Sequence, residues 1–254
     1  MIQLTGFLTL MKREVIRVFR IWPQTLLPSV MTTTLYFLIF GNFIGSRLGT
    51  LQGVSYIDYI IPGLIMMSVI TTSYSNVSST FFSAKFQRNI EELLVSPMKN
   101  STMLWGFVSG GVIRGCLVGT LVTIVSLIFS PLHIYDIGLV IFVMILTSIL
   151  FALGGFLNAL YANKFDDISI IPTFILSPLT YLGGVFYSIS LLPDFWRKAS
   201  LFNPILYIVN VFRYGFLGIS DIPIYTALLC LIVSIAILWR AIMFMLSKGV
   251  GARA

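Results

Sequence analysis

The side chains that most often do chemistry in proteins are scarce in this chain. It has one histidine, His133, so a zinc site built on paired histidines cannot form. Its two cysteines, Cys116 and Cys230, lie inside apolar runs, where they act as small apolar side chains or, as the alternative, form a disulfide or metal-binding pair. The adjacent carboxylates Asp166 and Asp167 point apart and have no acid–base partner nearby in the sequence. We therefore predict no catalytic site and no metal site, and we expect the acidic pair to start a helix or to make a contact.

A nucleotide-binding P-loop is excluded as well. That motif places a glycine directly before its lysine, and none of the lysines in this chain follows a glycine. The chain therefore does not bind ATP through a P-loop, and we expect no cofactor on it.

The composition indicates an integral membrane protein. Of 254 residues, 57% are hydrophobic and only 10% are charged, whereas a soluble domain has about a quarter charged residues. So few charges cannot cover the surface of a soluble protein of this size. The net charge of +7 comes from basic residues that flank apolar runs, a pattern typical of membrane topology signals and lipid head-group contacts rather than of nucleic-acid binding.

The apolar runs predict an all-α, polytopic membrane protein that forms one transmembrane domain over residues 1–254. The six predicted spans are 24–45, 58–79, 103–129, 137–161, 168–187 and 222–246. Residues 7–22 form an amphipathic pattern that suits an interfacial helix in the membrane surface; the alternative is a basic flank that only sets topology. The apolar runs within 188–218 are too short to cross, so we predict short external re-entrant helices there.

The most charged interior stretch is 81–97, which predicts a helix on the membrane surface that ends at Pro97. Its two faces differ in character. Phe82, Phe86, Ile90 and Leu93 fall on the apolar face, and Lys85, Arg88, Asn89 and Glu92 fall on the charged face.

Two spans contain unusual residues. Gly111, Gly115 and Gly119 are spaced by four and predict a smooth groove for close helix packing. Arg114 lies in the same span, so it must face protein or water; it either contacts the bundle or faces a substrate. The predicted fifth span is interrupted by candidate helix breaks, which serve either packing geometry or gating. These are Pro172, Pro178, Gly183 and Gly184.

The basic residues also predict an orientation. With six spans, one side collects Lys12, Arg13, Arg17, Arg20, Lys85, Arg88, Lys99, Lys164, Lys248 and Arg253, and the other side has Arg47, Arg197, Lys198 and Arg213. Because lysine and arginine accumulate on the cytoplasmic side, we predict that both termini and the 81–97 helix are cytoplasmic.

Three stretches resemble permeases of the type-2 ABC transporter family, and they sit where the topology requires them. They are FFSAKFQRNIEELLVSPMKNS (81–101), FDDISIIPTFILSPLTYLGGVFYS (165–188) and LFNPILYIVNVFRYGFLG (201–218). Within that family the chain is most similar to the YadH-like and NodJ-like bacterial permeases.

The resemblance implies a mechanism that hydropathy does not show. Two copies of the chain would form the substrate path of an exporter in the bacterial inner membrane. A separate cytoplasmic ATPase subunit, which would bind ATP and Mg²⁺, would dock on 81–97 as a coupling helix. The implied interface residues are Lys85, Phe86, Arg88, Asn89, Glu91 and Glu92.

Alternatives remain open on the sequence alone. Charges on a surface helix are often only solvated, and a stand-alone secondary carrier or a membrane scaffold would share this topology. The near-absence of acidic residues within the spans disfavours an ion-coupled carrier. Nothing in the sequence identifies the substrate.

Overall fold

A computed structural model describes residues 2–131 and 134–249, and these residues form an elongated bundle of helices. His133, which the sequence predicts in an exposed loop between two spans, and residues 250–254, which end the short basic stretch after the last predicted span, lie outside the described residues. The all-α class is confirmed, with one two-stranded hairpin, β1 Thr50–Leu51 and β2 Val54–Ser55, as the exception among the described residues.

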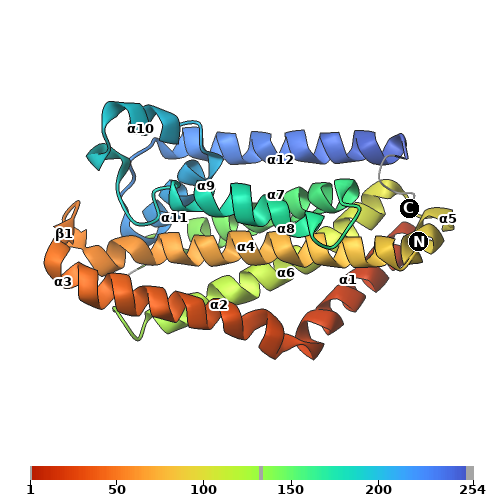
Figure 1. Cartoon of the computed structure of the whole chain (residues 1–254), viewed down its shortest axis with the longest axis horizontal. Coiled ribbons are helices and arrows are strands. Elements are labelled where there is room, and N and C mark those ends of the chain that lie inside the picture. Colours follow the sequence, from red (N-terminus) through yellow and green to blue (C-terminus); the bar gives the residue numbers. More distant parts are fainter. Residues whose placement is uncertain (1, 132–133, 250–254) are drawn as a thin grey trace.

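Four helices are long and apolar enough to cross a membrane, and they lie side by side along the bundle (Figure 1). They are α4 Tyr56–Phe86, α6 Asn100–Ser126, α7 Ile137–Tyr161 and α12 Ile224–Ser247. With 31 residues, α4 is about 46 Å long, whereas the apolar layer of a bilayer is about 30 Å thick. One or both ends of α4 must therefore extend beyond the apolar layer.

The other two predicted spans are helical segments that we call interrupted, because in each of them a π-helix stands between two α-helices. The first consists of α2 Trp22–Tyr36, the π-helix η1 Phe37–Ile44 and α3 Gly45–Leu48. The second consists of α8 Asp167–Ile171, the π-helix η2 Pro172–Leu176 and α9 Ser177–Tyr181, where Pro178 lacks the amide that would continue an α-helical pattern. The structure therefore shows four uninterrupted candidate spans and two interrupted segments where the sequence predicts six spans.

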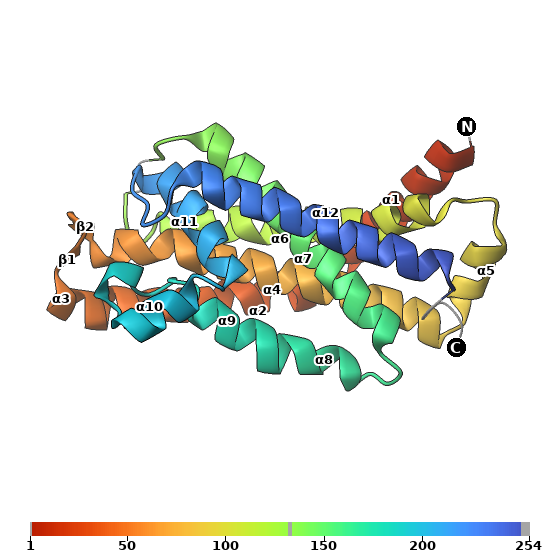
Figure 2. The ribbon, with the colours of Figure 1, turned by 90° about the horizontal axis from the view of Figure 1, so that it is seen from above.

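The two ends of the bundle carry different short elements. At one end lie the hairpin, α3 and three short helices, which are η3 Ile189–Leu191, α10 Asp194–Ser200 and α11 Pro204–Leu217. At the other end lie α5 Asn89–Val95, the start of α1 Ile2–Arg20 and the last turn of α12 (Figures 1 and 2). The start of α1 and the end of α12 thus share the end that carries α5.

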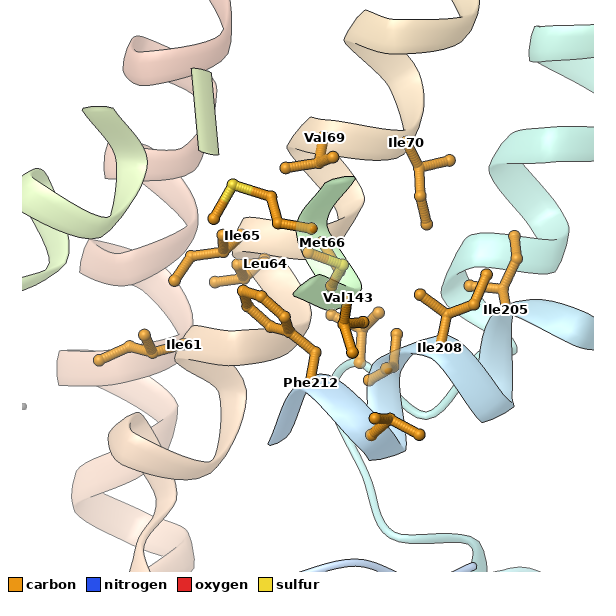
Figure 3. Close-up of a cluster of buried hydrophobic side chains, with 14 of the residues drawn as sticks. Ile61, Leu64, Ile65, Met66, Val69, Ile70, Val143, Ile205, Ile208 and Phe212 are labelled. Atoms are coloured by element: carbon orange, nitrogen blue, oxygen red, sulfur yellow. The ribbon is translucent and has the colours of Figure 1, made fainter. Parts of the chain in front are cut away.

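Helix α4 is the centre of the bundle and is buried on most sides. Figure 3 shows its residues Ile61, Leu64 and Met66 near Phe212 of α11 and Val143 of α7. Because lipid is as apolar as these side chains, close van der Waals packing rather than exclusion from water holds such helices together.

The predicted glycine groove on α6 is confirmed, and it faces α4 and α7. A Cβ atom added at Gly111 would lie 2.6 Å from Val77 of α4, and one at Gly119 would lie 2.8 Å from Val69. A second pair of glycines on α6, Gly106 and Gly110, was not predicted as a contact and packs against α1. Two glycine faces of α6 therefore allow close packing of three neighbouring helices, α4 and α7 on one face and α1 on the other.

Candidate functional site

The segment predicted as one helix over 81–97 is two helices, so that prediction is wrong. Helix α4 continues through Phe86, and α5 begins at Asn89. Between them Arg88 adopts the left-handed conformation, with φ 61° and ψ 6°, and its backbone N–H donates to the carbonyl of Lys85 at 3.0 Å. A left-handed residue ends an α-helix and redirects the chain, which the periodicity of side chains did not reveal.

Helix α5 lies at the end of the bundle with its charged side chains outward. Ile90 is buried against the apolar cluster that contains Phe81 and Phe82, and it anchors α5 to α4. The outward residues form what we name the α5 surface, and all of them are exposed: Phe86, Arg88, Asn89, Glu91 and Glu92. This surface combines two acidic groups, one basic group and a phenyl ring that is 62% exposed.

Lys85 does not belong to this surface, so its predicted place on the exposed charged face is wrong. Because α4 continues past it, Lys85 points toward α7 and is buried. Its Nζ donates to the carbonyl oxygens of Leu160 at 3.0 Å and Ala162 at 2.9 Å. The last carbonyls of a helix have no partner within the helix, and a buried ammonium group satisfies them here.

The turn between α7 and α8 is fixed at the same place by two further contacts. The ring of Phe165 packs edge-on against Phe82 and Phe86, at centroid distances of 4.9 and 5.0 Å. The carboxylate of Asp167 accepts the backbone N–H groups of Asn163 and Lys164 at 2.9 and 3.0 Å. These donors lower the pKa of Asp167.

Asp167 therefore stabilises the start of α8, as predicted for one member of the acidic pair. Together with Lys85 and Phe165, it connects the end of α4 to the interrupted segment that begins with α8.

Arg114 makes a contact within the bundle. Its Nη2 donates to the carbonyl of Thr25 in α2 at 3.2 Å. This contact is one of the two alternatives that the sequence leaves open, and it joins α6 to α2.

Of the candidate helix breaks, Pro172 and Pro178 lie where the helical segment changes between the α and π patterns, and Gly183 and Gly184 follow its end. The backbone N–H of Ser177 bonds to the carbonyl of Pro172, five residues earlier, which is the π-helical pattern. The segment ends at Tyr181, and Gly184 adopts a positive φ of +71°. A positive φ favours glycine, so Gly184 is suited to this turn.

Arg213 is a functional candidate that the sequence reasoning missed. It was counted among the basic residues of the external side, yet it is 1% exposed. Its Nη2 donates to the carbonyl of Gly184 at 2.6 Å, and its Nε donates to the carbonyl of Tyr59 at 3.3 Å. Its guanidinium group also lies 3.9 Å from the centre of the Tyr59 ring. Arg213 thus ties α11, the break at Gly184 and the first turn of α4 together.

Glu14 was missed as well, because the predicted apolar face of the amphipathic helix is rotated from the buried one. The spacing of apolar residues predicts a face made of Phe7, Met11, Val15, Val18 and Trp22. Of these only Val18 is buried, together with Leu10 and Glu14, while Trp22 is 51% exposed. Glu14 pairs with Arg17 at 3.0 Å, and Arg17 Nη2 donates to Asn76 of α4 at 2.9 Å. The spacing of Gly106 and Gly110 on α6 was the signal that could have located this face.

Within residues 2–131 and 134–249, no group of three or more His, Cys, Asp and Glu side chains could hold a metal ion. Cys116 and Cys230 are free thiols on different helices.

Comparison with known proteins identifies the family of this chain. The family model described as ABC-2 type transporter matches residues 5–217. This chain belongs to the ABC-2 type transporter family. It is 54% identical over 242 residues to the inner membrane transport permease YadH of Escherichia coli (strain K12). The aligned residues are 95% of this chain and 94% of YadH.

More distant relatives carry the name Nodulation protein J. The protein of Rhizobium leguminosarum bv. viciae is 23% identical over 235 residues, which are 87% of this chain and 91% of that protein. The protein of Neorhizobium galegae is 24% identical over 230 residues, with 87% and 88% coverage. The family resemblance seen in the sequence is thereby confirmed, and membership implies that this ABC-2 family member is a transport permease.

Proposed function

We propose that this chain is the membrane permease subunit of an ATP-driven exporter, with a separate cytoplasmic ATPase that docks on the α5 surface. The single observation that carries this proposal is the exposed α5 surface at one end of an ABC-2 family bundle. Ile90 holds α5 against α4, so a force applied to α5 reaches the longest helix of the bundle. The chain has no P-loop of its own, so ATP and Mg²⁺ must bind to the partner.

The contacts behind α5 support a route for the force into the bundle. Lys85 links the end of α4 to the last carbonyls of α7, and Phe165 links it to the turn before α8. A displacement of α5 would therefore move the interrupted segment that begins with α8. The breaks at Pro172 and Pro178 would let that segment bend, which is the gating role we assign to them, while Gly183 and Gly184 follow its end, where Arg213 holds the carbonyl of Gly184.

A second copy of the chain is part of the proposal. A cleft of about 220 Å³ between α2 and α4 is lined by hydroxyl groups, including those of Thr32, Thr33, Ser68 and Thr71. Thr32 and Thr71 are exposed at its surface. The lining also contains apolar side chains such as Leu64 and Met67, and a second copy placed over this cleft would enclose a path of mixed character between the protomers. Nearby, the Tyr36 and Tyr181 hydroxyls lie 2.9 Å apart and join α2 to α9, so the first, second and fifth predicted spans would line this path.

We further propose that the protein lies in the inner membrane, as the name of the relative YadH states for that protein, with the α5 end cytoplasmic. Six crossings, counting the two interrupted segments, would place both termini on that side. The opposite end of the bundle carries Arg47 on α3 and Arg197 and Lys198 on α10, in agreement with the smaller external count of basic residues.

The test is co-purification of the tagged chain with a P-loop ATPase, followed by ATP hydrolysis and transport in proteoliposomes. We expect a complex with the ATPase, and transport that depends on ATP. Double charge reversal, Glu91→Lys with Glu92→Lys, should reduce recovery of the ATPase by at least about tenfold, because it reverses two charges at the contact. The matched control is Arg197→Glu with Lys198→Glu on α10, which reverses two exposed charges at the other end and should leave the complex intact.

Two results would contradict the proposal. One is unchanged ATPase binding and unchanged ATP-driven transport in the Glu91/Glu92 variant. The other is transport by the chain alone in proteoliposomes without ATP, which would favour a secondary carrier.

A further inference from the structure

A second polar feature lies beside α5 and shares only Asn89 with the α5 surface. It is a cleft of about 590 Å³ between α1 and the end of α4 that carries α5. The α1 side of this cleft is strongly basic and is formed by Lys12, Arg13, Arg17 and Arg20. The opposite side is neutral and contains hydrogen-bonding groups, among them Ser83, Gln87 and Asn89.

The positive charge of this cleft is only partly neutralised. Glu14 is the one acidic residue in its lining, and its carboxylate is already paired with Arg13 at 3.3 Å and Arg17 at 3.0 Å. The ion pairs of the described residues do not include Lys12 or Arg20, and both side chains are exposed. The cleft therefore carries an excess of three positive charges.

A buried donor at the same place is also unsatisfied. Arg17 Nη2 is engaged by Asn76, but its Nε is buried and has no hydrogen-bond partner. Native proteins rarely leave such a donor without an acceptor. A ligand in the cleft cannot reach this inaccessible nitrogen, so the indication of an anionic ligand comes from the exposed charges of Lys12 and Arg20, which no ion pair neutralises.

The surroundings of the cleft specify the kind of anion. Ile16, which lines the cleft, is 46% exposed, and Phe19 of α1 and Trp22 at the start of α2 are 55% and 51% exposed. Ile16 and Phe19 share the outer surface of α1 with Lys12 and Arg20, which lie one helical turn before and one turn after Ile16. The ligand must therefore bring apolar chains as well as a negative charge.

We propose that this cleft binds the phosphate group of an anionic phospholipid, whose acyl chains lie along Ile16, Phe19 and Trp22. Lys12 and Arg20 contact the phosphate oxygens, and the neutral side chains of α4 complete the site. A lipid bound in this way bridges α1 to the end of α4. The inference rests on the proposed position of α1 in the membrane surface, but it does not require an ATPase on α5.

An acidic segment of a partner protein is the competing occupant. It would match the charge, but it would leave the exposed apolar side chains of α1 in contact with water. Free inorganic phosphate would match the charge as well and would gain nothing from those side chains. The pairing of cations with apolar groups on one helix favours the phospholipid.

The experiment measures lipid binding to the purified full chain in detergent by native mass spectrometry. The probes are phosphatidylglycerol and phosphatidylcholine with identical acyl chains. We expect one tightly retained phosphatidylglycerol per chain and at least about tenfold weaker binding of phosphatidylcholine. The variant Lys12→Gln with Arg20→Gln should weaken phosphatidylglycerol binding on the order of 30-fold, since each cation near a lipid phosphate contributes about fivefold.

The matched control is Arg197→Gln with Lys198→Gln, which removes two exposed charges from α10 and should leave phosphatidylglycerol binding unchanged. Circular dichroism of both variants verifies that the helices are intact. Equal binding of the two lipids, or unchanged phosphatidylglycerol binding in the Lys12/Arg20 variant, would overturn the proposal.

Two further measurements separate the competing occupants. Displacement of phosphatidylglycerol by millimolar inorganic phosphate would identify a simple anion site and overturn the lipid assignment. Loss of ATPase co-purification in the Lys12/Arg20 variant, with lipid binding unchanged, would identify a protein-docking site instead. Because lipid binding is measured on the chain alone, its failure and a failure of ATPase docking are distinguishable.

Discussion

The two ends of the bundle each contain a buried cation, and both cations donate hydrogen bonds to main-chain carbonyls, but in different surroundings. At the α5 end, Lys85 donates to the carbonyls of Leu160 and Ala162, where α7 ends. At the opposite end, Arg213 donates to the carbonyls of Gly184 and Tyr59, beside a break in the chain. In both places the hydrogen-bond acceptors of the cation are main-chain oxygens, and neither cation belongs to an ion pair of the described residues.

The difference lies in how firmly each cation is held. Two nitrogen atoms of Arg213 donate to carbonyls on separate parts of the structure, and its guanidinium group also lies over the ring of Tyr59. Lys85 donates to two carbonyls at the end of α7 through a single nitrogen atom at the tip of a flexible side chain. We infer that the end with Arg213 is a rigid anchor, while the end with Lys85 is a joint that can move with α5.

The largest effect is expected from Arg213→Met. The substitution keeps an unbranched side chain but removes the donors to the carbonyls of Gly184 and Tyr59 and the cation–π contact with Tyr59. We expect the free energy of unfolding in detergent to fall by about 3 kcal/mol, since two carbonyls lose a hydrogen-bond partner and a desolvated cation–π contact is lost. Thermal unfolding followed by circular dichroism measures the change, and Arg213→Lys should recover part of it.

A smaller effect on stability is expected from the matched substitution Lys85→Met. It removes one hydrogen-bonding group at the end of α7, so the loss should be about 1–2 kcal/mol. Because Lys85 lies behind the α5 surface, the variant should still bind the ATPase but transport more slowly for each ATP hydrolysed. If Lys85→Met and Arg213→Met destabilise the fold equally, the distinction between an anchor and a joint is wrong.

The third prediction concerns the helix that packs beside the joint. In Gly110→Ala the added Cβ would lie 2.8 Å from Glu14, so α1 must shift away from α6, at a cost of about 1–2 kcal/mol. In the control Gly154→Ala the new Cβ would lie no closer than 3.5 Å to Tyr74, so stability should be unchanged or slightly higher. Hydrogen exchange should show faster exchange in α1 of the Gly110 variant and no change around Arg213. Faster exchange at both ends would mean that the ends are not independent.

The sequence predicted the parts of this fold that depend on hydropathy and on glycine spacing. The four uninterrupted helices coincide with predicted spans, and the Gly111–Gly115–Gly119 face packs as expected. Side-chain periodicity could not reveal the left-handed conformation of Arg88, because that conformation is a property of the backbone. The prediction of one coupling helix over 81–97 failed for this reason.

The buried cations were misjudged for a different reason. A charge in a sequence is ordinarily expected to face water or to pair with an opposite charge, and the structure shows neither arrangement for Lys85 or Arg213. Their partners are carbonyl oxygens freed by helix ends and breaks far away in sequence, which become visible only when the helices are packed. The prediction that Glu91 and Glu92 lie on the surface is correct, because neither carboxylate belongs to an ion pair of the described residues and both side chains stay exposed.

The smallest expected effect lies at the joint itself, at Asp167. Backbone donors from Asn163 and Lys164 lower the pKa of its carboxyl group, so the ionised form stabilises the turn before α8. This contribution is present above the pKa of the unfolded chain, about 3.9, and is lost as the pH falls through the lowered value in the folded protein.

Acidification from about pH 5 toward pH 3 should therefore weaken the protection of these two amides against hydrogen exchange, after correction for the intrinsic rate. In Asp167→Asn the same amides should be less protected at neutral pH and should show no such titration. The amides of Gly184 and Tyr59 near Arg213 serve as the reference. If the protection of Asn163 and Lys164 does not change with pH in the unmodified protein, Asp167 does not stabilise the joint.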